Sequence, residues 1–328
     1  MMQVGLDTFT IRELGLDPFA TLNFIREHGL EGAQFGGLRS LSPELDLGRL
    51  REVRAHADDL GLYTHVSVPT CNPHLVQGSI DEHLAETARQ IELAAQCGWH
   101  ELHSSLGSGP ERYEHPVRWP QHLADSAGLI RRLGPVLRAH RSRMNLETHG
   151  DTTTFELVRL IEDVDPDIAG ICLDTANVLC HAEDPVMAAR RAAPYTHLTH
   201  TKDAIVYFSE TGYTRQGRAP GQGCLDWEAI LPILGEFSPN LPLSIEDHKW
   251  LFTAHIFDRH WLALHPDLTP HELAQVVKLV QQCEKRIAAG HLEQPDEYEA
   301  IPYRDQMMER LRFGRDYLLG VLERRGLR

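Results

Sequence analysis

Four short stretches beyond residue 143 each consist of an apolar or β-branched run that ends on polar residues. They read MNLETHGD (144–151), GICLDTAN (170–177), HLTHTKD (197–203) and LSIEDH (243–248). Short apolar runs bounded by turn residues are typical of strands buried on both faces, as in a parallel sheet. The four stretches therefore predict four such strands, each with polar side chains at its carboxyl end.

The earlier part of the chain repeats this pattern. Four further runs have strand character: Val4–Phe9, Gly32–Phe35, Tyr63–Val68 and Glu101–Ser105. Between most of the runs lie segments whose apolar residues recur three and four apart, as in Ser79–Cys97. Eight alternating units predict an α/β fold, a (β/α)8 TIM barrel with a C-terminal helical extension. An open doubly wound sheet is the alternative, although no glycine-rich dinucleotide loop follows the first strand.

The chain beyond the eighth strand is longer than a barrel requires. We expect residues 1–265 to form the barrel catalytic domain, and residues 266–328 to form the final barrel helix and a C-terminal helical extension. Two helical patterns, Pro270–Ala289 and Asp305–Arg325, lie in this last part. The sequence leaves three roles open for the extension: packing on the outside of the barrel, a homo-oligomer contact, or a cover over the barrel mouth.

Composition and charge restrict the class of protein. Of the 328 residues 42% are hydrophobic, and 47 acidic against 32 basic residues give a net charge of −15. Such a field repels phosphate backbones and anionic lipids, so neither a nucleic-acid nor a membrane partner is expected. The six cysteines form no CxxC pair, the first residues lack the apolar run of a signal peptide, and no segment resembles a membrane span. We expect a cytoplasmic globular protein.

Four polar residues follow the last four predicted strands: Glu147, Asp174, His200 and Glu246. In a TIM barrel the active site lies at the carboxyl ends of the strands, so these side chains should meet at one mouth. Three carboxylates directed at one point repel one another unless a cation lies among them. The set predicts a site for one divalent metal ion, Mn²⁺ or Mg²⁺, with Co²⁺, Fe²⁺ or Zn²⁺ as alternatives. Taken singly, a residue such as Asp174 is more often a helix N-cap or an ion-pair partner.

The same motifs carry a family resemblance. LET, LDTAN, HLTHTKD, SIED and QGRAPGQGCLDW (216–227) together resemble the xylose-isomerase-like TIM barrels of the sugar phosphate isomerase/epimerase group, which includes the ketose 3-epimerases. The resemblance runs from Val4 to about His248. It implies that the four strand-end residues bind one divalent metal ion, and that Glu147 and Glu246 act as acid and base beside the substrate carbonyl.

The resemblance implies an isomerase or epimerase that acts on a keto sugar or sugar acid by proton transfer through a metal-stabilised enediolate. A lyase (decarboxylase, dehydratase or eliminase) acting on a 3-oxo sugar derivative through the same enediolate is the alternative. The expected partner is a small-molecule carbohydrate. A DNA-repair endonuclease of the same superfamily is disfavoured by the charge and by missing histidines. A non-catalytic carbohydrate-binding barrel stays open, and metal content would distinguish it from an enzyme.

Further residues are candidates for substrate contact. Lys202 resembles the lysine of the family's HxKD motif and is a catalytic candidate in proton transfer, with an ion pair as the alternative reading. Asn177 stands where many members have a substrate-binding histidine. Arg218 offers a fork of donors to a hydroxyl or carboxylate, unless it is a plain loop arginine. His103 and His149 lie near the ends of the fourth and fifth strands, where they contact substrate or orient a glutamate.

The stretch directly after the eighth strand, HKWLFTAHIFDRHW (248–261), is rich in aromatic residues. Because the chain leaves this strand at the catalytic end, we expect Trp250, Phe252 and Phe257 to cover the barrel mouth and exclude water. The alternative is that these residues are structural and bury against a helix or a second subunit.

Overall fold

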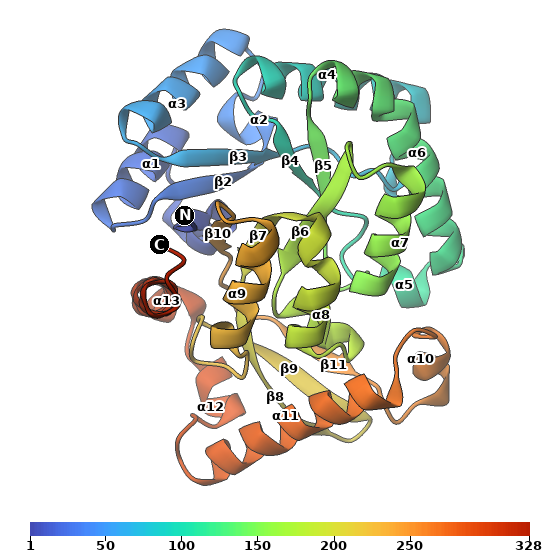
Figure 1. Cartoon of the computed structure of the whole chain (residues 1–328), viewed down its shortest axis with the longest axis vertical. Helices are drawn as coiled ribbons and strands as arrows, with labels where there is room; N and C mark the ends of the chain where they lie inside the picture. The colour runs from blue at the N-terminus through green and yellow to red at the C-terminus, as the bar shows by residue number, and fades with distance from the viewer.

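The computed structural model describes all 328 residues, Met1–Arg328. At its centre eight parallel strands close into a barrel in the order β1-β10-β7-β6-β5-β4-β3-β2, which confirms the predicted (β/α)8 fold (Figure 1). The barrel strands are β1 (Gln3–Asp7), β2 (Gly32–Gly37), β3 (Tyr63–Ser67), β4 (Glu101–Ser104), β5 (Arg143–Glu147), β6 (Ala169–Asp174), β7 (Thr196–Thr201) and β10 (Pro242–Ile245). Each coincides within a few residues with a run predicted from the sequence.

Helices surround the barrel and begin where the sequence offers caps. Asp17 and Asp184 accept hydrogen bonds from the first turns of α1 and α8, each followed by proline, and Thr153 forms a capping box with Glu156 at α7. The helices outside the barrel wall are α1 (Pro18–Glu27), α3 (Leu47–Asp59), α4 (Ile80–Gln96), α6 (Trp119–Ala139), α7 (Thr154–Val164), α8 (Pro185–Ala192), α9 (Trp227–Phe237) and α13 (Tyr303–Arg325). Shorter helices lie in the connections: α2 (Leu38–Leu41), α5 (Glu111–Glu114), and the 3-10 helices η1 (Thr8–Leu14), η2 (Pro73–Leu75), η3 (Asn177–His181) and η4 (Ala193–Tyr195).

Strand register sets the positions of the predicted site residues. Asp174 of β6 pairs with His200 of β7, and His200 pairs with Ser244 of β10, two residues before Glu246. Glu147 pairs with Cys172, two residues before Asp174. The four predicted ligands therefore lie at similar heights along neighbouring strands, at the carboxyl end of the barrel.

A second, antiparallel sheet was not predicted. It consists of β8 (Asp203–Ser209), β9 (Gly212–Arg218) and β11 (Leu251–Ala254), in the order β11-β9-β8. The first two form a hairpin within the long connection after β7, and the third follows β10. Helix α11 (Pro270–Ala288) packs on β8, as seen in the lower part of Figure 1, and α10 (Arg259–Ala263) and α12 (Pro295–Ala300) flank it in the chain.

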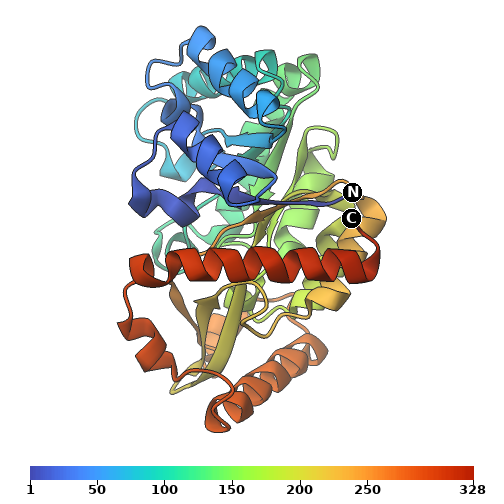
Figure 2. The same ribbon diagram turned by 90° about the vertical axis from the view of Figure 1, so that its left-hand side faces the viewer.

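The two C-terminal helical patterns have different positions. The first is α11, which covers the second sheet. The second is α13, which packs against β1, β10 and α9 and so takes the place of the eighth barrel helix; Figure 2 shows it lying across the side of the molecule. The backbone N–H of Met2 donates to Leu327 O at 3.1 Å, so the two termini are adjacent. The domain boundary at residue 265 stays a prediction.

The apolar side chains form one continuous core that runs from Met2 to Leu322. None of the helices combines the length and the hydropathy that crossing a bilayer would require.

A buried ion pair connects α13 to the loop that carries Glu246. Arg310 donates from Nε to Asp247 Oδ2 at 2.7 Å and from Nη2 to Asp247 Oδ1, and the side chains are 3% and 1% exposed. Tyr303, also on α13, donates to the backbone oxygens of Thr10 and Asp247 at 2.9 and 2.5 Å. The terminal helix thereby fixes the backbone directly beside a predicted metal ligand.

Replacing Arg310 should therefore be costly. Arg310→Leu leaves the Asp247 carboxylate buried without its partner, and we expect the free energy of unfolding to fall by about 3 to 5 kcal/mol in urea denaturation. The double variant with Asp247→Asn should recover much of this loss. Arg312→Leu on the exposed side of the same helix is the control, expected to change stability by less than about 0.5 kcal/mol. If Arg310→Leu and Arg312→Leu lower the free energy of unfolding by the same amount, the ion pair is not important for stability.

Candidate metal centre and substrate cavity

The four predicted ligands meet at the carboxyl end of the barrel. Glu147, Asp174 and His200 end or nearly end β5, β6 and β7, and Glu246 directly follows β10. Each offers one ligand atom, and these atoms all lie within 4.8 Å of one another. Three of the residues are buried, and Glu246 is partly exposed. The arrangement is therefore a compact O₃N donor set on the floor of the barrel mouth.

Asp174 caps the turn after β6 with one oxygen and directs the other toward the cluster, so the cap and the proposed ligand role are compatible. Its Oδ1 accepts hydrogen bonds from the backbone N–H groups of Ala176 and Asn177, both at 3.0 Å, which caps the turn after β6. Its own N–H donates to Thr148 Oγ1 at 2.8 Å. Its Oδ2 is buried and faces the ammonium group of Lys202 at 2.8 Å. The capping bonds therefore fix the carboxylate while the second oxygen stays available as a ligand.

Glu147 is oriented by two histidines. His103 Nε2 lies 3.1 Å from Oε2 of Glu147, and His200 Nδ1 lies 3.2 Å from Oε1. Ser67 Oγ lies 2.8 Å from Nδ1 of His103 and fixes that ring. Burial raises the pKa of Glu147, but the charges of His149 and His200 outweigh it and hold the pKa well below its usual value. His103 thus positions Glu147, one of the two roles predicted for it.

His200 is held by two residues that no sequence pattern singles out. The side-chain amide of Gln34, on β2, lies 2.6 Å from Nε2 of His200, and Asp7 Oδ2, at the end of β1, lies 3.6 Å from the same nitrogen. Nδ1 consequently faces Glu147 and, at 3.3 Å, Oε2 of Glu246. No local motif marks either residue: Asp7 ends β1, which is a weak signal, whereas Gln34 lies inside β2 and has none.

Lys202 balances the charge of the cluster. Its Nζ lies 2.8 Å from Oδ2 of Asp174, 2.6 Å from Oε2 of Glu246 and 3.1 Å from Nε2 of His248. Burial lowers the pKa of Lys202, but Asp174 and Glu246 outweigh it and raise the pKa above its usual value. Burial raises the pKa of Glu246 in turn, yet Lys202 and His200 bring it well below normal.

The contacts of Lys202 with the two carboxylates are close ion pairs. Oδ2 of Asp174 and Oε2 of Glu246 lie at charge-assisted hydrogen-bond distance from its ammonium group. Both oxygens keep lone pairs directed into a buried cluster. Three carboxylates and one imidazole gathered within 4.8 Å of one another form an oxygen-rich donor set of the kind that suits a hard divalent cation.

The other predicted residues divide between two places. His149 lines the cavity above the cluster, with its ring centroid 5.7 Å from that of Trp250. Asn177 is fully buried, and neither polar atom of its side chain has a partner. Arg218 lies elsewhere: its guanidinium stacks 3.3 Å from the centroid of the Tyr298 ring and donates to Gln216. Substrate contact stays a prediction for all three residues.

Arg215 is a site residue that the sequence analysis missed. It lies on β9, is fully buried, and has no partner for Nε or Nη2. Burial raises the pKa of Asp174, and the positive charge of Arg215 partly opposes that rise. Burial lowers the pKa of His248 to about 3, and the charge of Arg215 adds to that decrease. Its guanidinium carbon lies 5.3 Å from the Trp250 ring centroid. Only the pairing of β9 with β11 brings this arginine close to the barrel mouth.

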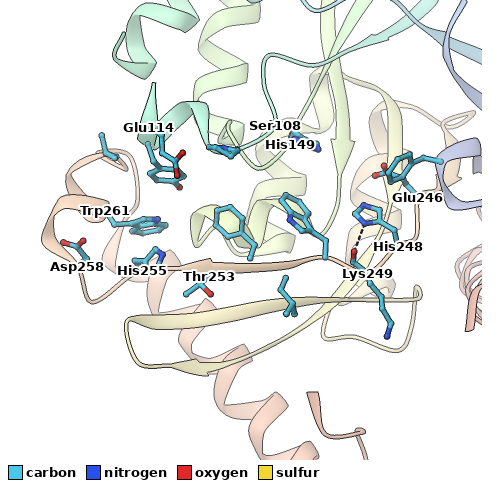
Figure 3. A pocket seen from close by; sticks show the side chains of 18 of the residues that line it. Ser108, Glu114, His149, Glu246, His248, Lys249, Thr253, His255, Asp258 and Trp261 are labelled. Atoms are coloured by element: carbon cyan, nitrogen blue, oxygen red, sulfur yellow. Dashed lines mark hydrogen bonds between the residues drawn. The ribbon is translucent and has the colours of Figure 1, made fainter. Parts of the chain in front are cut away.

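A cavity of about 980 Å³ opens above the cluster. In Figure 3, Glu246 and His248 lie at one end and Trp261 and Asp258 at the other. Trp250 and Phe252 line it, in agreement with the position expected from the sequence, whereas Phe257 does not and is 63% exposed. Whether the two lining aromatics exclude water during a reaction stays a prediction.

Comparison with known proteins places this geometry in a family. Residues 22–254 match the family model described as "Xylose isomerase-like TIM barrel". The chain is 23% identical to 3-oxo-isoapionate decarboxylase of Pectobacterium atrosepticum over 219 residues, which is 66% of this chain and 70% of that protein. It is 28% identical to the uncharacterized protein YihM of Escherichia coli over 99 residues, 29% of this chain, and the match spans only 30% of YihM.

Solved structures share the fold at low sequence identity. D-psicose 3-epimerase with D-tagatose from Clostridium cellulolyticum H10 superposes with a TM-score of 0.63 at 16% identity, covering 86% of this chain and 99% of that one. A xylose isomerase-like TIM barrel protein from Mycobacterium smegmatis, in complex with magnesium, superposes with a TM-score of 0.59 at 19% identity. The match covers 85% of this chain and 97% of that one.

The donor set predicts metal-dependent stability. Protein stripped with a chelator should bind one Mn²⁺ or Mg²⁺ ion per chain, and saturation at about 100 times Kd should stabilise the fold by about 2.7 kcal/mol, seen as a rise in Tm. Asp174→Asn keeps the capping oxygen but removes the charge, so affinity should fall at least about tenfold. Glu101→Gln, at the opposite end of the barrel, is the control. Unchanged stoichiometry and affinity in Asp174→Asn would disprove the site.

Proposed function

Since the chain belongs to the xylose isomerase-like TIM barrel family, we propose that it is a divalent-metal-dependent isomerase or epimerase. Its substrate would be a keto sugar or sugar acid. One observation carries the proposal: the carboxylates of Glu147 and Glu246 converge on the same atom, 3.2 and 3.3 Å from Nδ1 of His200. Two carboxylates within reach of one bound carbon skeleton are what proton removal and return require. Named relatives that modify sugars and sugar acids support the same class.

Glu147, Asp174, His200 and Glu246 would hold the ion, with Mn²⁺ or Mg²⁺ favoured by the oxygen-rich donors and Co²⁺, Fe²⁺ or Zn²⁺ as alternatives. Magnesium in the Mycobacterium smegmatis relative supports this choice. The bound ion would supply positive charge that stabilises the negative oxygen developing as a proton leaves the neighbouring carbon.

The protein's own residues would carry the proton. Glu246 lines the cavity, and its side chain is 12% exposed against 5% for Glu147, so we assign proton removal to Glu246. Its depressed pKa keeps it ionised and able to accept a proton. Glu147, held by His103, would deliver the returning proton after taking one up from solvent, and Glu246 would release the proton it removed to solvent. Lys202, whose Nζ lies 2.6 Å from Glu246 in this structure, would donate to a substrate oxygen once the ion has replaced it between the carboxylates.

A lyase is the second candidate, favoured by two observations. The relative that matches across two thirds of the chain is a decarboxylase. Arg215 provides a buried guanidinium without partners for Nε and Nη2, which suits a substrate carboxylate. In that reaction the carbon–carbon bond to the carboxylate breaks, carbon dioxide leaves, and its electron pair stays on the sugar as an enolate that a glutamate then protonates.

Glutamine replacements test the proton-transfer residues. Glu147→Gln and Glu246→Gln keep size and one acceptor but cannot take up a proton, so each should slow turnover by roughly 10²-fold or more. The assay is deuterium incorporation from D₂O into ketoses and 3-oxo sugar acids, with metal content measured in the same samples. Glu101→Gln is the control.

The products separate the two candidates. Deuterium in a recovered sugar isomer or epimer indicates the first candidate, and release of carbon dioxide or water indicates the lyase. Near-normal exchange in both glutamine variants, with metal bound, would remove Glu147 and Glu246 from the mechanism.

A further inference from the structure

The cavity is longer than one sugar ring needs. Glu246, where the proposed reaction takes place, lies at one end, and Trp261 and Asp258 line the other (Figure 3). The volume of about 980 Å³ is at the upper limit of the roughly 300 to 1,000 Å³ typical of pockets that enclose drug-sized ligands. A single monosaccharide is smaller than such ligands. The end near Trp261 therefore has no function in proton transfer to a lone sugar.

Aromatic side chains connect the two ends. The ring centroids of His248 and Trp250 are 6.3 Å apart, and those of Trp250 and Phe252 are 5.8 Å apart with their planes at 78°. Phe252 and Tyr113 are partly exposed and line the cavity. Partly exposed aromatic rings in a concave site offer flat apolar surface on which another ring can pack.

The charges of the lining restrict what binds at the far end. The cationic lining residues Arg12 and Lys249 belong to the Glu246 end: Arg12 lies over the ring of Phe9, which packs against His248, and Lys249 follows His248 in the chain. Around Trp261 the charged lining residues are the acids Glu114 and Asp258. A phosphate or carboxylate would be repelled there, so an uncharged group is favoured.

We propose that the cavity binds a neutral glycoside, in which the reacting sugar lies at the Glu246 end and a second, uncharged ring packs against Phe252. The position of the reacting sugar rests on the proposed function; the second ring rests on the length, aromatic lining and charge of the cavity. A second sugar and an aromatic aglycone share the required chemistry, a neutral ring with an apolar face.

Affinities of matched glycosides test this directly. Full-length protein saturated with Mg²⁺ is titrated by calorimetry with methyl β-D-glucoside, phenyl β-D-glucoside and cellobiose. We expect phenyl β-D-glucoside, cellobiose or both to bind about tenfold more tightly than the methyl glycoside, because a stacked ring adds favourable contacts. The tighter of the two identifies the second ring as aromatic or as a sugar. Equal affinity for all three compounds, at whatever level, overturns the proposal.

Two variants locate the second ring. Phe252→Ala removes the packing surface, and Leu264→Trp fills the same end of the cavity without opening the core. The affinity gain is the ratio of the affinity for the two-ring glycoside to that for the methyl glycoside. Each variant should reduce this affinity gain at least about fivefold and leave the affinity for the methyl glycoside unchanged. Phe257→Ala, an exposed aromatic outside the cavity lining, should keep the full gain. A gain that survives both Phe252→Ala and Leu264→Trp would place the second ring elsewhere and overturn the proposal.

Failure of this proposal and failure of the proposed function give different results. Loss of the proposed function would appear as exchange activity that is independent of metal and of Glu147, whatever the glycoside affinities. Loss of the second-ring site would appear as equal glycoside affinities in a protein that still binds one metal ion and still exchanges deuterium.

Discussion

The ammonium group of Lys202 lies between two carboxylates, 2.8 Å from Asp174 and 2.6 Å from Glu246, at the buried end of the barrel. Without a cation at this point, three carboxylates within 4.8 Å of an imidazole would repel one another in a medium of low dielectric. The folded chain therefore depends on positive charge at its centre. A divalent ion could take over that role, since the same carboxylate oxygens that now face the lysine are the donors of the proposed metal site.

The surrounding structure would hold the carboxylates in place while a divalent ion replaces the ammonium group of Lys202. Backbone N–H groups fix Asp174, His103 fixes Glu147, and Gln34 fixes the ring of His200. The loop after β10 is held from outside the barrel by Arg310 of α13. Because these supports come from separate elements, the donor set is preorganised by the whole fold rather than by one loop. The second sheet then adds a wall above it and extends the cavity beyond the metal centre.

Sequence patterns predicted the barrel and the convergence of four candidate ligands for a simple physical reason. Buried parallel strands read as short apolar runs, and in this fold polar residues at their carboxyl ends converge on one mouth. Both signals are local along the chain, so residues such as Glu147 and Glu246 could be selected without knowing any contact. No local motif marks the supports Gln34 and Asp7, and only the closed barrel places them beside His200.

Strand pairing between distant parts of the chain explains why the second sheet was not predicted from the sequence. The strand β11 pairs with β9 across more than thirty residues that include α9 and β10, and no spacing rule anticipates that register. This pairing brings Arg215 toward the mouth and forms one wall of the cavity. Tyr298, contributed by the distant α12, packs against the guanidinium of Arg218, a contact that no local pattern indicates. The run of β-branched and aromatic residues in AIVYF (204–208) was the available signal for the hairpin.

Anomalous diffraction from crystals of the full chain soaked in Mn²⁺ would test the central claim most directly. The account predicts a single strong peak about 2.0 to 2.4 Å from donor atoms of Glu147, Asp174, His200 and Glu246, with the ammonium group of Lys202 moved away from between Asp174 and Glu246. A peak elsewhere, or a lysine still bridging the two carboxylates at saturating Mn²⁺, would contradict it.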